Sequence, residues 1–95
     1  ANWLGMHLAT FTEEVASQSG IPHVPGVIVA DVTHGSPAYR ASVVPGTIIL
    51  QVNNEPVETV EELRIQAERK SAKQDRVSLI IQEPDGTVAR RVIRR

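Results

Sequence analysis

A chain of 95 residues that is 41% hydrophobic and 22% charged has the composition of a single globular domain and not of a disordered tail. The absence of cysteine excludes disulfides, zinc–thiolate sites and thiol nucleophiles, and a net charge of −1 argues against nucleic acid as the main partner. No apolar run approaches the roughly 20 residues that cross a bilayer, so no membrane span is expected within this chain. The C-terminal basic cluster is expected to be the solvated end of a strand; it consists of Arg90, Arg91, Arg94 and Arg95.

Residues 3–10 predict the first strand, because an apolar side chain recurs at every second position, at Leu4, Met6 and Leu8. Gly5 lies at the start of this pattern, and a glycine inside a strand typically marks a bulge or a close approach to the backbone. Successive N–H groups around such a glycine can form an anion-binding nest. On this pattern alone, an ordinary first strand with a glycine at its end is the simpler interpretation.

Capping signals predict the helices. Thr12 competes with Thr10 to cap a helix of about two turns. Ser36 is a favourable N-cap before a proline, and Thr59 with Glu62 forms a capping box. The helices are therefore expected to end before Gly20, to run over residues 37–42, and to run over residues 60–70.

The remaining strands are expected where β-branched residues are concentrated. They are residues 26–33, 47–52, 76–83 and 87–93. Asn53-Asn54 is expected to form a tight turn, and Pro84-Asp85-Gly86 is expected to close a hairpin between the last two strands. Several connections are too short for parallel crossovers. The fold class is therefore α+β and mainly β: a small, partly open antiparallel barrel or sandwich of five or six strands, capped by one long helix and one or two short ones.

Three blocks of this sequence together resemble the PDZ domain: Gly26-Val-Ile-Val, Gly35-Ser-Pro-Ala38 and Pro45-Gly-Thr-Ile-Ile-Leu-Gln-Val-Asn-Asn-Glu-Pro-Val57. The opening Trp3-Leu-Gly-Met6 and the short Thr-Glu-Glu helix are more narrowly similar to the bacterial kind that is attached to HtrA/Deg-type serine proteases. Residues 1–95 are thus expected to be one PDZ domain cut from a larger protease. The sequence departs from the family pattern at two places, which are Ser42, where glycine is usual, and Thr47, where aspartate is usual.

The resemblance implies a peptide-binding groove along the opening strand. The extended C-terminus of a partner would add as a strand to residues 6–10, and its terminal carboxylate would meet the N–H groups of residues 4–6. The last residue of the partner would be apolar, because apolar side chains floor the pocket. For Val60 and Ala67, packing in the core is as good an explanation as peptide binding. For Arg64, a solvated position beside the apolar stripe of the helix is as good an explanation as peptide binding. The implied peptide-binding residues are Leu4, Gly5, Met6, His7 and Leu8 on the strand, and Val60, Arg64 and Ala67 on the helix.

No catalytic or metal site is expected in this chain. Asp31, His34 and Ser36 have the residue types of a serine triad, but they lie within six consecutive residues, which do not naturally form such a relay. The three histidines lack metal-ligand spacing. We therefore expect a binding module without a cofactor. The resemblance implies C-terminal peptides of substrate or misfolded proteins and an attached protease domain as its partners, in the periplasm or cell envelope.

Two other functions stay open at this point. One is a PDZ domain of another protease class, such as an intramembrane metalloprotease or a C-terminal processing protease. The opening Trp-Leu-Gly-Met strand and the short helix after it weigh against that class. The other is a scaffold or assembly module with no protease attached.

Overall fold

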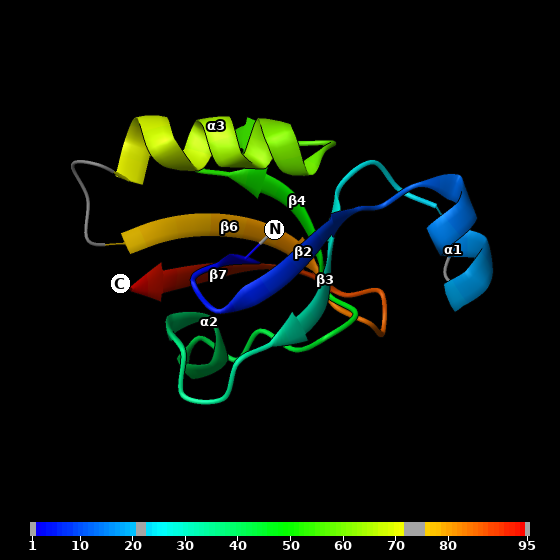
Figure 1. Ribbon diagram of the computed structural model, residues 1–95, viewed down its shortest axis with the longest axis horizontal. Coiled ribbons are helices and arrows are strands. Elements are labelled where there is room, and N and C mark those ends of the chain that lie inside the picture. The colour runs from blue at the N-terminus through cyan, green and yellow to red at the C-terminus, as the bar shows by residue number, and fades with distance from the viewer. Residues whose placement is uncertain (1, 21–22, 72–75, 95) are drawn as a thin grey trace.

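The computed structural model describes residues 2–20, 23–71 and 76–94 (Figure 1). None of the helices in these ranges is long and apolar enough to span a membrane. The described elements are β1 (Asn2–Trp3), β2 (Met6–Thr10), α1 (Glu13–Ser19), β3 (Val27–Val32), α2 (Pro37–Arg40), β4 (Ile48–Val52), β5 (Glu55–Pro56), α3 (Val60–Ser71), β6 (Arg76–Gln82) and β7 (Val88–Arg94).

The described strands form one antiparallel sheet in the order β1-β2-β3-β4-β6-β7, and β5 pairs with β4 outside this path. The longest ladder joins β6 to β7, from Arg76 opposite Arg94 to Gln82 opposite Val88. The predicted mainly β, antiparallel fold with one long and two short helices is confirmed. The two-residue strands β1 and β5 were not predicted, since two residues are too few to show a period.

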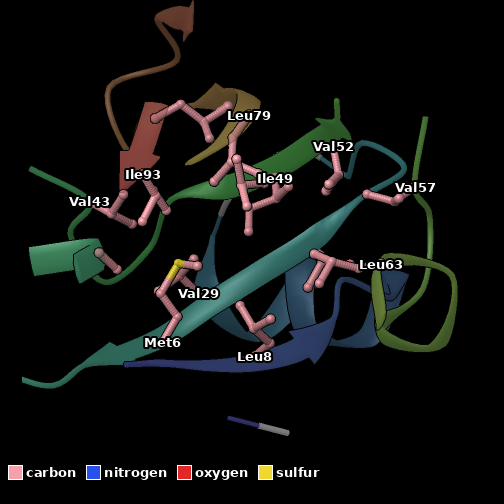
Figure 2. Packing of buried hydrophobic residues seen from close by; sticks show 14 residues of the cluster. Met6, Leu8, Val29, Val43, Ile49, Val52, Val57, Leu63, Leu79 and Ile93 are labelled. Atoms are coloured by element: carbon pink, nitrogen blue, oxygen red, sulfur yellow. The ribbon is translucent and has the colours of Figure 1, made fainter. Parts of the chain in front are cut away.

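The main hydrophobic core contains side chains of the sheet together with Leu63 of α3, which runs along one side of the molecule, and Ala38 of α2 (Figures 1 and 2). In β2 the alternation predicted from the sequence holds, because Met6 and Leu8 are 0% and 4% exposed while His7 points to solvent. Among the α3 side chains that the structure describes, residues 60–66, Leu63 is the buried one. A smaller cluster lies under α1, which stands at the far end of the molecule; it contains Phe11, Ala16, Ile28 and Ile48.

Of the two threonines that were predicted to compete for the N-cap of α1, Thr12 takes that position and Thr10 does not. Thr12 caps α1 by accepting a hydrogen bond from the Val15 N–H (3.2 Å). The hydroxyl of Thr10 instead accepts from the Val60 N–H, 3.2 Å away, at the start of α3. Thr59 also accepts from the Glu62 N–H (3.1 Å), which is the N-cap half of the predicted capping box, and the Glu62 carboxylate accepts from the Thr59 hydroxyl at 3.5 Å. Thr10 therefore ties the end of β2 to the first turn of the long helix.

Neither of the two departures from the family pattern is a residue of β2 or α3. Ser42 has a φ of 67°, so the helix end after α2 adopts the left-handed conformation that glycine would adopt more easily. Thr47 is 1% exposed, and its hydroxyl has no hydrogen-bond partner among the described residues. The predicted tight turn at Asn53 and Asn54 forms, with φ values of 50° and 71°.

The C-terminal basic cluster begins on the edge strand β7. Arg91 pairs with Glu83 at 2.5 Å, and Arg90 is exposed. The Arg94 side chain and Arg95 lie outside the described residues. The described part of the cluster therefore fits the expected solvated end of a strand.

Two leucine-sized positions on α3 test whether this helix holds the core together. Leu63 is 1% exposed and Ile65 is 47% exposed on the same helix. We expect Leu63→Ala to lower the free energy of unfolding by about 2–5 kcal/mol, because it leaves a cavity in the core. Ile65→Ala, the matched control, should change it by about 0.5 kcal/mol. Urea denaturation measures both, and equal losses would contradict the packing described here.

Candidate functional site

The candidate site begins at a two-residue turn, Leu4–Gly5, that joins β1 to β2. Both residues have positive φ, 53° and 86°. Two positive φ values in a two-residue hairpin connection define a type I′ turn, whose twist matches that of the flanking strands. The sequence indicated the unusual backbone at Gly5 but not at Leu4. A branched residue in this conformation costs roughly 1–2 kcal/mol, so the surrounding structure has to hold it there.

Two hydrogen bonds hold this turn, one from the loop between β3 and α2 and one from the first turn of α2. The Thr33 N–H donates to the Gly5 carbonyl at 2.7 Å, and the Ala38 N–H donates to the Leu4 carbonyl at 3.2 Å. Both peptide groups are trans, so the N–H of each points opposite to its carbonyl. The N–H groups of Gly5 and Met6 therefore face away from residues 33–38.

Gly5 also lies directly against Ser36, the N-cap of α2. A Cβ added to Gly5 would lie under 3.0 Å from both the Cβ and the Oγ of Ser36, closer than real Cβ atoms approach other atoms. Ser36 is held in place because its Oγ accepts a hydrogen bond from the Tyr39 N–H at 3.2 Å. Glycine is thus required at position 5 for space as well as for φ. The sequence contained no signal for this contact, because the two residues are distant in the chain.

The predicted site residues divide into buried and exposed groups. Met6 and Leu8 belong to the main core, and Leu4 and Val60 are partly buried against it. His7 and Arg64 are exposed. Ala67 lies on α3, but its side chain is outside the described residues. The structure thus places the strand and the helix that were predicted to form the groove next to each other, joined by the Thr10–Val60 hydrogen bond.

One feature of the groove strand was not predicted. β1 pairs antiparallel with β2, with Trp3 opposite Met6 and Asn2 opposite His7, and β3 pairs with the other edge of β2. In Figure 1 the blue N-terminal segment turns back alongside β2. At Met6 and His7 the edge of β2 that was predicted to pair with a partner peptide therefore already carries a strand of this chain.

The residues of serine-triad type have separate local roles. The Asp31 carboxylate accepts from the Val32 N–H at 2.9 Å, Ser36 caps α2, and the His34 ring packs on Tyr39 with centroids 4.4 Å apart. Within residues 2–20, 23–71 and 76–94, no group of three histidine, cysteine or acidic residues could hold a metal ion. The site that this geometry defines is a backbone edge ending in a tethered glycine turn.

Residues 3–82 match the PDZ domain family, so this chain belongs to that family. A PDZ domain is a binding module, and the expectation that this chain is not itself an enzyme is confirmed. The proteins to which this chain is similar include DegP/HtrA-type proteases. The "Probable periplasmic serine endoprotease DegP-like" of Chlamydia muridarum is 37% identical over 91 residues, which cover 95% of this chain and 18% of that protein. This chain therefore spans less than a fifth of the length of that relative.

Two solved structures have the same fold. The HtrA3 PDZ domain bound to a phage-derived ligand (FGRWV) superposes with a TM-score of 0.78 at 22% identity, over 99% of this chain and 84% of that chain. The HtrA-type protease AlgW with decapeptide gives a TM-score of 0.79 at 22% identity, over 97% of this chain and 28% of that one. Both neighbours are HtrA-type and both are described with peptide ligands.

The contact between Gly5 and Ser36 makes a quantitative prediction. Gly5→Ala should lower the free energy of unfolding by about 2–4 kcal/mol, from the positive φ and the overlap with Ser36. Ser36→Gly alone should cost a few tenths of a kcal/mol, as for other N-cap serines replaced by glycine. In the double variant the overlapping atoms are gone, so part of the loss, about 1–2 kcal/mol, should be recovered. Urea denaturation of the four proteins gives the coupling, and additive losses would contradict the contact.

Proposed function

We propose that this PDZ domain binds the free C-termini of proteins by strand addition to β2. The observation that carries the proposal is the orientation of the Leu4–Gly5 turn. Its two carbonyls are bonded to residues 33–38, which leaves the N–H groups of Gly5 and Met6 facing away from that segment at the beginning of β2. A carboxylate placed there would accept hydrogen bonds from a preorganised pair of donors, and the chain leading into it would run antiparallel to β2.

The side chains around this position favour an apolar last residue. Leu4 is partly buried against the core that contains Met6 and Leu8, and Val60 borders the same cluster from α3. An apolar side chain entering between β2 and α3 would therefore contact apolar surface. By correspondence with the family, Arg64 and Ala67 complete the helix side of the groove.

For the whole protein we propose a DegP/HtrA-like serine endopeptidase of the periplasm or cell envelope. The curated relative named as a periplasmic serine endoprotease supports this, since its similarity covers 95% of this chain. In such a protein the domain would recognise exposed C-termini of substrates or misfolded proteins and present them to the attached protease, or relieve its inhibition.

Carboxylate dependence tests the proposal directly. The peptide FGRWV, described with the HtrA3 neighbour, serves as the probe in its free-acid form and as its C-terminal amide. Hydrogen bonds to a charged acceptor are worth about 1.5–3 kcal/mol against about 1 for a neutral one, so the amide should bind at least about tenfold more weakly by titration calorimetry. Equal affinities of acid and amide would refute the carboxylate site at Leu4–Met6.

The exposed Arg64 predicts a preference within the peptide. If its guanidinium borders the groove, Arg64→Ala should reduce the preference for peptides with Asp or Glu near the C-terminus by up to about tenfold. Stability should change by less than about 1 kcal/mol, because pairs at exposed positions contribute little. Arg40→Ala, an exposed arginine on α2, is the control. A peptide-library profile that is the same for the two variants would place Arg64 outside the groove.

A further inference from the structure

We propose that residues Asn2–Trp3 act as an intramolecular ligand of the peptide groove. β1 would cover the start of the β2 edge in the free domain, and a peptide would have to displace it before pairing with Met6 and His7. This inference rests on the proposed function, because it concerns the regulation of the same site. The apparent affinity for a peptide would then depend on how strongly β1 competes for the same edge of β2.

The direction of β1 supports this competition. β1 is antiparallel to β2, and its C-terminal residue, Trp3, is the one that meets the Leu4–Gly5 turn. A peptide that places its C-terminus at that turn and adds antiparallel to β2 runs in the same direction along the same edge. Both strands would use the N–H and C=O groups of Met6, because Trp3 pairs with Met6 across the turn, whereas the backbone groups of His7 face β3. The two strands therefore cannot be paired with Met6 at the same time.

Beside the turn, β1 and a bound peptide would use the same hydrogen-bond donor, the Met6 N–H. In a type I′ turn the N–H of the fourth residue is commonly directed at the carbonyl of the first, here Met6 and Trp3. The Trp3 carbonyl oxygen would then occupy the place proposed for an oxygen of the peptide carboxylate. β1 thus imitates a bound C-terminus with a neutral acceptor, and a charged acceptor forms the stronger hydrogen bond.

The structure also explains how β1 could leave without destroying the site. Strands of two residues form marginal hairpins, and the turn needs Leu4 at positive φ, so the β1–β2 pairing has little stability of its own. The bonds from Thr33 and Ala38 to the turn involve no residue of β1. The carbonyls of Leu4 and Gly5 can therefore stay tethered after β1 departs, with the N–H groups available to a peptide.

Two variants of Trp3 test the competition with a matched control. Trp3→Pro removes the side chain and the backbone N–H that antiparallel pairing uses, whereas Trp3→Ala removes the side chain and keeps the N–H. If β1 competes, the affinity for FGRWV as free acid should be about three- to tenfold higher in Trp3→Pro than in Trp3→Ala, the effect of one backbone hydrogen bond on the competing strand. Titration calorimetry of the 95-residue chain measures both.

Nuclear magnetic resonance on the unsubstituted chain provides a second measurement that does not depend on either variant folding. Backbone nuclear Overhauser effects between Asn2 and His7 and between Trp3 and Met6 should be present in the free domain and lost at saturation with peptide. Equal affinities in the two variants, or cross-strand effects that persist in the complex, would overturn the inference while leaving peptide binding intact. Failure of the peptide to bind either variant or the unsubstituted chain would overturn the proposed function, and the inference with it.

Discussion

The site depends on the tethering of one turn to a neighbouring helix. Leu4 and Gly5 both have positive φ values. For Leu4 this conformation is unfavourable, so a chain without tertiary contacts would not keep it. Two hydrogen bonds to their carbonyls and the close approach of Gly5 to Ser36 fix the turn against the segment that starts α2. Because a trans peptide points its N–H opposite to its carbonyl, fixing the carbonyls on one side sets the donors on the other. A preorganised pair of donors costs little further ordering when an anion arrives.

The rest of the fold positions the edge that leads away from this turn. At its far end, Thr10 accepts from the Val60 N–H and so holds β2 against the start of α3. Between the two ends, Met6 and Leu8 are committed to the core, which prevents β2 from sliding, since a shift by one residue would expose them. The backbone of β2 is thus fixed at both ends and along its length. The proposed recognition through main-chain pairing requires such a rigid template.

The sequence predicted what local patterns can encode. Period-two alternation located β2, the cap residues Ser36 and Thr59 located two helices, and the Asn53-Asn54 turn formed as expected. Contacts between distant residues were not accessible in this way. Thr10 looked like a cap for the helix that follows it and instead caps one that begins 50 residues later, because tertiary geometry decides which N–H lies within its reach. The contact of Gly5 with Ser36 is of the same kind, whereas β1, a local hairpin partner of β2, was missed because two residues are too few to show a period.

An intramolecular strand at the groove gives the domain a property that a rigid pocket lacks. Binding of a peptide and release of β1 are linked, so whatever weakens the pairing of β1 raises peptide affinity, and a bound peptide weakens that pairing by the same factor. The size of the effect is limited by the stability of a two-residue strand, which is small. A strong intramolecular ligand would block the site. A weak one shifts the apparent affinity for the peptide while the tethered turn keeps the geometry that the peptide needs.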